Sequence, residues 1–336
     1  MSRHLEADRG VTVQRRTWRR RLVSITVALL GMSVVLWFWA TQPLLLPGPV
    51  NPIAPASPMH LETHVRTLAE TCAPRDTDHP ETLECAAAYI RGTFEKAGGS
   101  VTEQVFMMSD GVEYRNVIAM FGPVSDERII VGAHYDAVID SPAADDNASG
   151  VAGLIELAYL LGKTDLPLQV ELVAHTLEEY GYVGSQRHAT RLELQEARVR
   201  AVIIIDMIGY FKDEPHTQEG PSLLRPFYPT TGNWILIAGK WEQGWLARRV
   251  KQAMRRESVL PVHSVNLPPW MLPKIAHADH QSYWEAGYSQ AILVTDTADF
   301  RNENYHTPTD TSETLDYERM EMVVRGLYAA IQSLGR

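Results

Sequence analysis

The sequence predicts a three-layer α/β domain with a mixed, mostly parallel sheet, preceded by one transmembrane helix. Short β-branched segments alternate with segments whose apolar residues recur every three or four positions, which is typical of strands and helices that follow one another. A chain of 336 residues with 45% hydrophobic residues can also bury one large core. An uncharged run near the N-terminus predicts the transmembrane helix.

That run covers residues 22–40, LVSITVALLGMSVVLWFWA, which is close to the roughly 20 residues that a helix needs to cross a bilayer. Residues 1–21 contain seven arginines, so we expect them in the cytoplasm and the rest of the chain on the extracytoplasmic side, the periplasm in a bacterium. A cleaved signal peptide is the rival interpretation. Its apolar region is usually shorter, and no convincing small-x-small site follows Trp39, so an uncleaved single-pass anchor is favoured.

Proline and small residues dominate the next stretch, and we interpret residues 41–58 as a linker and residues 59–336 as the folded domain. The domain opens with two segments of helical periodicity, 60–70 and 81–99, of which the second ends at glycines. Two strands of an antiparallel section follow, at 101–108 and 115–122. The remaining predicted elements, in order, are a strand at 127–133, a helix at 150–162, strands at 168–176, 199–206 and 290–296, and a closing amphipathic helix at 317–334. Residues 210–234 resemble a long loop, and long loops in compact domains tend to be functional.

Charge is distributed unevenly along the chain. The whole chain has a formal net charge of −10, residues 1–21 carry +5, and the remainder therefore carries −15. Such an acidic domain lacks the basic face that nucleic acid requires, so nucleic-acid binding is not expected. The sequence indicates no particular oligomeric state.

The only two cysteines are Cys72 and Cys85. A pair that closes a short loop outside the cytoplasm predicts a disulfide, because two thiols alone make an incomplete structural zinc site. We expect it to join two N-terminal helices.

Acidic residues and histidines fall at or just beyond the carboxyl ends of the predicted strands, where open α/β sheets form ligand sites. Each has an ordinary explanation when taken alone, such as a helix N-cap or a solvated turn. Together they predict a cation, because clustered carboxylates without one would destabilise the fold. The residues are His134, Asp145, Glu178, Glu179, Asp206 and His306.

Three carboxylates and two neutral imidazoles would be neutralised by two Zn²⁺ ions and one hydroxide, and this mixture of donors suits zinc better than calcium or magnesium. In this hypothesis Asp145 bridges the two ions and Asp146, facing the other way, shapes the loop. Asp136 is expected to orient an imidazole ligand. The glutamates divide the work, with Glu179 on the metal and Glu178 as the proton acceptor.

Six blocks in this order, GAHYDAV, AADDNASG, LEEYGYVGS, IIDMIG, ADHQSYWEAG and YHTPTDT, resemble the signature blocks of the M28 zinc peptidases, a family that includes co-catalytic aminopeptidases and glutaminyl cyclases. The resemblance covers about residues 59–334. It implies the three-layer zinc-exopeptidase fold with a mixed eight-stranded sheet. It also implies two zinc ions held by His134, Asp145, Glu179, Asp206 and His306, with Glu178 as general base.

The sequence departs from the family pattern in three places. Tyr180 stands in the LEEYG block, where a smaller or polar residue is common. No tyrosine shortly precedes the ADH block, so another donor or the metals would have to stabilise the oxyanion. No inserted protease-associated domain is visible. Asp279 matches a family position near the active site, whereas His175, His188, His216 and His277 are expected to be surface or satisfied core residues.

The sequence therefore predicts a membrane-anchored zinc aminopeptidase that hydrolyses the N-terminal bond of peptides with a free N-terminus, using water activated between two zinc ions. A single-zinc glutaminyl cyclase is the alternative enzyme, and metal stoichiometry distinguishes the two. A catalytically inactive receptor or scaffold on the same fold is a third interpretation, disfavoured by the intact set of ligands and base. A serine hydrolase is disfavoured because the chain has no G-x-S-x-G turn.

Overall fold

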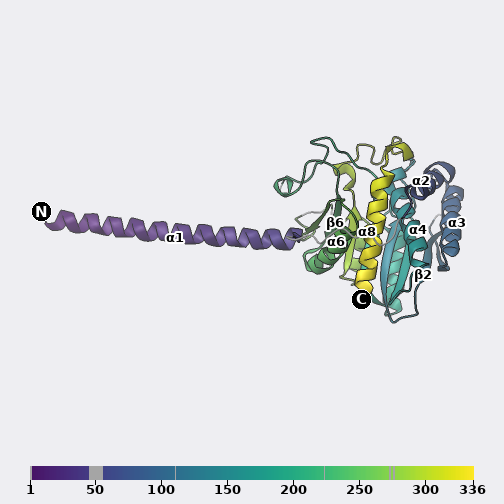
Figure 1. Cartoon of the computed structure of the whole chain (residues 1–336), viewed down its shortest axis with the longest axis horizontal. Helices are drawn as coiled ribbons and strands as arrows, with labels where there is room; N and C mark the ends of the chain where they lie inside the picture. Colours follow the sequence, from purple (N-terminus) through teal and green to yellow (C-terminus); the bar gives the residue numbers. More distant parts are fainter. Residues whose placement is uncertain (1, 45–55, 110, 223, 272–273, 275–276) are drawn as a thin grey trace.

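The structure is a computed structural model that describes residues 2–44, 56–109, 111–222, 224–271, 274 and 277–336 (Figure 1). A single long helix, α1 (Ser2–Thr41), projects from the α/β domain. Its segment Arg20–Thr41 is 22 residues long and apolar enough to cross a membrane, which fits either a single-pass anchor or a signal peptide. The predicted linker at 41–58 falls mostly on residues 45–55, which lie outside the described residues.

The end of α1 contacts the domain directly. The Trp39 ring stacks on Trp241 with 5.9 Å between the ring centroids. The buried Lys251 donates from Nζ to the carbonyl oxygen of Thr41 at 3.0 Å, and the Ser264 hydroxyl donates to the same oxygen at 2.7 Å. Residues ahead of the predicted domain start at 59 therefore pack on the folded part.

The sheet has eight strands in the order β1-β2-β4-β3-β5-β8-β6-β7. Strands β4, β3, β5 and β8 run parallel to one another, β6 and β7 form a second parallel pair, and the β1–β2, β2–β4 and β6–β8 pairings are antiparallel. The mixed, mostly parallel sheet is as predicted. The strands are β1 (Ser100–Met107), β2 (Glu113–Phe121), β3 (Glu127–His134), β4 (Gln169–His175), β5 (Arg198–Ile205), β6 (Ile235–Gly239), β7 (Val262–Asn266) and β8 (Ala291–Thr295).

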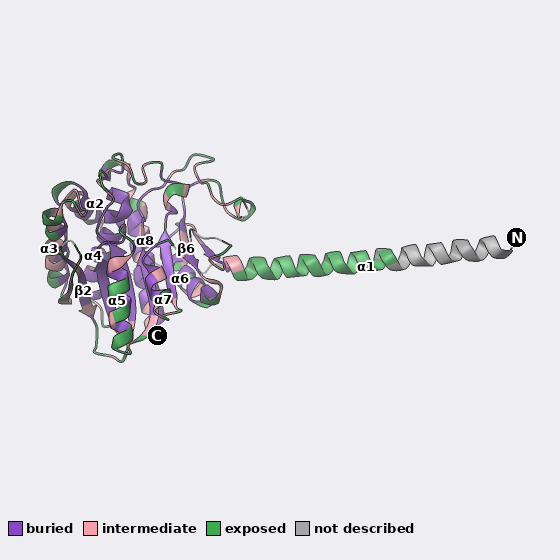
Figure 2. Ribbon diagram, turned by 180° about the vertical axis from the view of Figure 1, so that it is seen from behind, coloured by how far each residue is buried: buried purple, intermediate pink, exposed green. Residues whose placement is uncertain are grey.

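Helices cover both faces of the sheet and give three layers. Along β3, Ile129 and Val131 join one hydrophobic core while Ile130 joins the other, because successive strand residues point to opposite faces. The first core includes α2 (Pro58–Arg66), α3 (Pro80–Lys96), α4 (Gly150–Leu161), α6 (Gly244–Glu257) and α8 (Tyr317–Gly335), which lie in front in Figure 1. The second includes α5 (Val183–Leu194) and α7 (His280–Glu285), which lie in front in Figure 2.

Short helical turns connect these elements. They are η1 (Thr67–Thr71), η2 (Ala144–Ser149), η3 (Arg225–Phe227), η4 (Trp241–Gln243), η6 (Ala298–Phe300) and η7 (Ser312–Thr314). The predicted helix at 60–70 divides into α2 and η1. The predicted loop at 210–234 has no strand among its described residues and contains only η3. The predicted disulfide is confirmed, since Cys72, directly after η1, is bonded to Cys85 in α3.

Candidate metal centre

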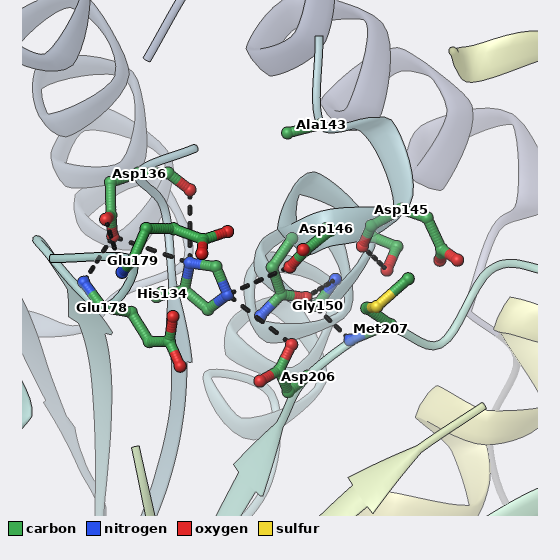
Figure 3. A network of polar contacts seen from close by, with 12 residues as sticks. His134, Asp136, Ala143, Asp145, Asp146, Gly150, Glu178, Glu179, Asp206 and Met207 are labelled. Atoms are coloured by element: carbon green, nitrogen blue, oxygen red, sulfur yellow. Dashed lines mark hydrogen bonds and ion pairs between the residues drawn. The ribbon is translucent and has the colours of Figure 1, made fainter. Parts of the chain in front are cut away.

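The candidate site is built at the carboxyl edge of three neighbouring parallel strands. His134 is the last residue of β3, Glu178 and Glu179 follow β4, and Asp206 follows β5. Because β4, β3 and β5 are adjacent and parallel, their carboxyl ends bring these side chains to one place (Figure 3). Asp146 reaches the same place from η2, and His306 from the loop after η6.

Asp146 lies between the two imidazoles. Its Oδ1 is 3.3 Å from Nε2 of His134, and its Oδ2 is 2.9 Å from Nε2 of His306. Two groups of potential metal ligands share Asp146. One consists of His134, Asp146 and Asp206, and the other consists of Asp146, Glu179 and His306. Within each group the ligand atoms lie within 4.8 Å of one another, so each could hold a metal ion. Asp146 is the one residue common to both groups.

The structure corrects the assignment of Asp145. Its Oδ1 accepts a hydrogen bond from the backbone N–H of Gly209 at 2.9 Å, and its Oδ2 accepts one from Asn302 Nδ2 at 2.8 Å. Figure 3 shows its carboxylate turned away from His134, whereas that of Asp146 turns toward it. The two neighbours do face opposite ways, as expected, but Asp146 takes the central position and Asp145 ties down the loop.

Asp310 explains part of this arrangement. Its carboxylate accepts from the backbone N–H groups of Asp145 and Asp146 at 3.0 and 3.1 Å. The Asp310 carboxylate thus holds the backbone N–H groups of Asp145 and Asp146 in place. The Asp145 side chain in turn accepts hydrogen bonds from Gly209 and Asn302. Since Asp310, Gly209 and Asn302 are distant in sequence, the order of the two aspartates in the chain does not reveal which one faces the site.

Asp136 organises the site from behind, although not by the contact expected. The Nδ1 of His134 lies 3.2 Å from the backbone oxygen of Asp136 and 3.6 Å from its Oδ1. The Asp136 carboxylate accepts instead from the backbone N–H groups of Glu178 and Glu179 at 3.0 and 3.1 Å. Asp136 therefore fixes both glutamates, and its carbonyl orients the His134 ring so that Nε2 points to the other acidic residues.

The electrostatics of the site favour a bound cation. Burial raises the pKa of Glu178 well above its usual range, and burial followed by the charge of Asp146 raises the pKa of Glu179 to about 7. Burial likewise raises the pKa of Asp206. These carboxylates crowd one another in a buried space, and divalent cations would relieve both the repulsion and the desolvation. Imidazole nitrogens combined with carboxylate oxygens are a donor set that fits zinc.

A cavity of about 240 Å³ opens beside this cluster. Asp146, Glu178, Glu179 and Asp206 line one side of it. The opposite walls are mainly apolar and come from β6, β7, β8 and the 210–234 loop, as with Leu236, Val265, Leu293, Leu224 and Trp234. The long loop thus lines the cavity, as its length suggested. Among the described residues of the segment 267–273, Trp270 is exposed and does not line the cavity.

Sequence reasoning missed Tyr305, which also lines this cavity. Its ring stacks on the ring of His306 with 3.8 Å between centroids. Burial raises the pKa of its hydroxyl, and the charges of Asp146, Asp206, Glu179 and Glu178 raise it further, which places Tyr305 close to the acidic cluster. The sequence offered one signal for Tyr305, which is that it directly precedes the predicted ligand His306 in YHTPTD.

An α/β domain that gathers histidines and carboxylates at the carboxyl edge of its sheet, beside a cavity, is the arrangement expected of a zinc metallopeptidase. The chain belongs to peptidase family M28, whose model matches residues 116–331. The predicted family, fold and enzyme class are thereby confirmed.

Individual relatives agree with this assignment. The chain is 39% identical to the uncharacterized protein YfbL of Escherichia coli over 81% of this chain and 87% of that protein. It is 25% identical to leucine aminopeptidase 1 of Metarhizium robertsii over 69% of this chain, and the match spans 57% of the fungal protein.

Solved structures share the fold. The zinc aminopeptidase BSAP of Bacillus subtilis superposes with a TM-score of 0.68 at 16% identity, covering 82% of this chain and 95% of that one. A glutaminyl cyclase of Bacteroides thetaiotaomicron superposes with a TM-score of 0.62 at 18% identity, covering 83% and 99%. At these identities the likeness concerns the fold and does not decide between the two reactions.

Proposed function

We propose that this metallopeptidase is a di-zinc aminopeptidase that removes apolar residues from the free N-terminus of peptides. The observation that carries the proposal is the position of Asp146, whose two carboxylate oxygens face His134 and His306 separately. One ion would be held by His134, Asp146 and Asp206, and the other by Asp146, Glu179 and His306.

When bound, the zinc ions would polarise the scissile carbonyl and lower the pKa of the attacking water. Glu178 takes the proton of that water and returns it to the leaving amine, a role that suits a buried carboxyl whose pKa burial raises. Asp136 keeps Glu178 and Glu179 in place through their backbone N–H groups. Tyr305 would donate a hydrogen bond from its hydroxyl to the developing oxyanion and keep its proton, which supplies the donor that the sequence lacks before the ADH block.

The apolar cavity supports the proposed substrate class. Leu236, Val265 and Leu293 offer a wall on which an apolar side chain would be removed from water, while the acidic cluster beside it would attract a protonated α-amino group. A substrate whose N-terminal residue occupies the cavity would place the following peptide bond next to Glu178. Acetylation of the α-amino group removes its charge and should abolish cleavage.

The cyclase alternative is disfavoured by the two donor groups that share Asp146, because a single-zinc enzyme needs only one of them. An inactive scaffold is disfavoured because Glu178 and every proposed ligand line or adjoin the cavity.

We also propose that the chain stays anchored, with its domain on the extracytoplasmic side. Stacking of Trp39 on Trp241 supports an uncleaved helix, because cleavage at the end of the apolar segment would remove Trp39 from the domain. The Cys72–Cys85 disulfide supports an oxidising compartment.

The test uses the full chain purified in detergent. Zinc content is measured, and hydrolysis is followed on aminoacyl chromogenic substrates with Leu, Phe, Ala, Glu and Lys at the N-terminus, each free and N-acetylated. We expect two zinc ions per chain, a preference for Leu and Phe, no cleavage of acetylated substrates and no cyclisation of an N-terminal glutamine. One zinc ion together with cyclisation would instead identify the alternative enzyme.

A further inference from the structure

The helix α6, at the edge of the domain next to α1, is strongly basic. It contains five basic residues and one acidic residue, Glu257. The basic residues are Arg248, Arg249, Lys251, Arg255 and Arg256. Residues 22–336 carry a formal charge of −15, the difference between −10 for the chain and +5 for residues 1–21. The helix is therefore a positive region on an acidic domain, and the proposed reaction makes no use of it.

Most of this positive charge lies on the side of α6 that faces away from the core. Leu246, Val250 and Met254, four residues apart, are buried and pack into the core. The residues of the opposite side are exposed or partly exposed. We call them the outer stripe of α6, and they are Trp245, Arg248, Arg249, Gln252, Arg255 and Arg256.

The arginines of the outer stripe keep their positive charge available. Arg248 donates from Nη1 to the carbonyl oxygen of Pro43 at 3.0 Å, and Arg255 donates from Nη1 to that of Leu260 at 3.2 Å. A carbonyl oxygen accepts such a hydrogen bond without cancelling the charge. Burial, followed by the charges of Arg248 and Arg255, lowers the pKa of Lys251 to about 8, which agrees with a positive potential around α6.

This helix is held to the end of the apolar segment of α1, and Figure 1 shows it at the edge of the domain next to α1. The guanidinium carbon of Arg248 lies 5.6 Å from the centre of the Phe38 ring. Lys251 donates from Nζ to the carbonyl oxygens of Thr41 and Gln42 at 3.0 and 3.3 Å. These contacts fix the position of α6 relative to the last turn of α1.

The last turn of α1 marks the level of the bilayer surface in the proposed anchored state. The apolar segment Arg20–Thr41 has 22 residues. A helix of that length rises about 33 Å and crosses a hydrocarbon core of about 30 Å. Trp37, Phe38 and Trp39 at its end are the kind of residues that gather where lipid meets water. Since α6 contacts Phe38, it lies at the level of the lipid head groups.

Two exposed tryptophans lie at the same edge of the domain. Trp245 and Trp270 are 59% and 79% exposed, whereas Trp234 and Trp284 are buried. Trp245 lies in the first turn of α6. Trp270 lies four residues after β7, the edge strand whose Ser264 contacts α1. Tryptophan favours the interface between hydrocarbon and head groups, so both side chains suit a surface that meets a membrane.

We propose that the outer stripe of α6, together with Trp270, docks on the bilayer in which α1 is anchored and binds the phosphate groups of anionic phospholipids. The proposal rests on the proposed anchoring by an uncleaved helix. Guanidinium groups bind phosphate oxygens through charge-assisted hydrogen bonds, and basic residues beside a membrane helix are attracted to anionic lipids. Because β6 and β7 also line the cavity, docking holds the cavity close to the bilayer.

The first experiment measures whether α6 meets lipid. The full chain is reconstituted in nanodiscs that contain a lipid with a nitroxide quencher on its head group. A bimane fluorophore is attached at Gln252→Cys in the outer stripe, or at Gln195→Cys as the matched control. Gln195 is exposed and follows α5, which packs on the opposite face of the sheet from α6. The two native cysteines form the disulfide and take no label.

In nanodiscs that contain phosphatidylglycerol, we expect quenching at position 252 to exceed quenching at position 195 by roughly twofold or more, because the arginines attract the anionic head groups. Quenching at position 252 should fall in discs of phosphatidylcholine alone. Equal quenching at the two positions would overturn the docking. Equal quenching at position 252 in both kinds of disc would show closeness to the bilayer without recognition of anionic lipid, and would overturn the role of the arginines.

The second experiment removes two charges in Arg255→Gln/Arg256→Gln, combined with the label at position 252. The ratio of docked to undocked domain should fall by roughly 30-fold. Quenching should then be lost at a lower NaCl concentration than with the arginines present, because salt screens the remaining charges. Arg187→Gln/Arg191→Gln in α5 makes the same change in net charge and should leave the salt dependence unchanged. Equal salt dependence of both double variants would contradict the proposal.

Further measurements separate the possible failures. Circular dichroism and zinc content show whether each variant is folded, and if the α6 variant is not, the comparison of the two kinds of disc decides. The intact mass of the chain extracted from membranes tests the anchoring. A cleaved chain would contradict the anchoring and the docking with it, whereas an intact chain without quenching at position 252 would contradict the docking alone. Neither readout depends on hydrolysis, so a failure of the proposed activity remains distinct.

Discussion

The Oδ2 of Asp146 lies 2.9 Å from Nε2 of His306, while the carboxylate of the preceding residue, Asp145, is bonded to Gly209 and Asn302. Replacing either aspartate by asparagine therefore has different consequences. We expect Asp146→Asn to lose zinc and to lower kcat/KM by at least roughly 100-fold, the scale on which loss of a catalytic group is felt. Metal analysis and steady-state kinetics measure both effects.

Asp145→Asn is the matched control, one residue away. It should retain zinc but unfold more easily, by about 1–3 kcal/mol, because an amide group cannot satisfy both donors that the carboxylate accepts from. If Asp145→Asn lost zinc and Asp146→Asn kept it, the assignment of the two aspartates would be reversed.

Glu178→Gln tests the proposed base. The amide cannot accept the proton of the attacking water, so turnover should fall by about 10²-fold or more while the zinc content stays near that of the wild type. Kinetics on a leucine substrate and metal analysis of the same preparation provide the measurement. Full activity in the zinc-loaded variant would exclude Glu178 as the base.

Tyr305→Phe tests the proposed oxyanion donor. The phenyl ring keeps the stacking on His306, so zinc binding and KM should change little. Loss of the hydroxyl should lower kcat by roughly 10- to 100-fold. This is at or below the low end of the range for oxyanion donors, because the metal ions would also stabilise the negative charge of the oxyanion. Tyr182→Phe serves as a control, because the charges of Glu178, Asp206 and Glu179 also act on Tyr182 although it does not line the cavity. An equal effect of both variants would argue against a specific donor.

The lowered pKa of Glu171 should make the free energy of unfolding depend on pH in a predictable way. Burial alone would raise its pKa, but hydrogen bonds from His188 and then Arg128 lower it from 4.5 to about 2. A carboxyl with a lowered folded-state pKa contributes stability above its unfolded pKa and loses it as the pH falls through the folded value. The contribution, on the order of 3 kcal/mol at neutral pH, should therefore diminish between about pH 4.5 and 2.

The measurement compares the wild type with Glu171→Gln by thermal unfolding in detergent across this pH range, in the presence of a chelator so that metal loss does not contribute. The wild type should be more stable at neutral pH, and the difference should shrink on acidification. Glu285→Gln, on the exposed side of α7, should show a small difference at every pH. A pH-independent difference for Glu171→Gln would contradict the lowered pKa.

Much of the fold could be predicted because local patterns sufficed. The β-branched runs that became β3, β4, β5 and β8 are short and bounded by polar residues, and the apolar segment of α1 needs no tertiary context. The segments that became α5, α6, β6 and β7 were not predicted. For α6 the sequence is rich in charged residues, and β6 and β7 are five residues each, too short for an alternating pattern to be recognised.

The sequence by itself determined which strand ends carry histidine and carboxylate, because parallel strands bring their carboxyl ends to one edge whatever the details of packing. Only the tertiary structure decided that Asp146 and not Asp145 faces the imidazoles. That choice depends on hydrogen bonds that Gly209 and Asn302 donate to the Asp145 side chain and that the Asp310 carboxylate accepts from the backbone, and no local pattern encodes them.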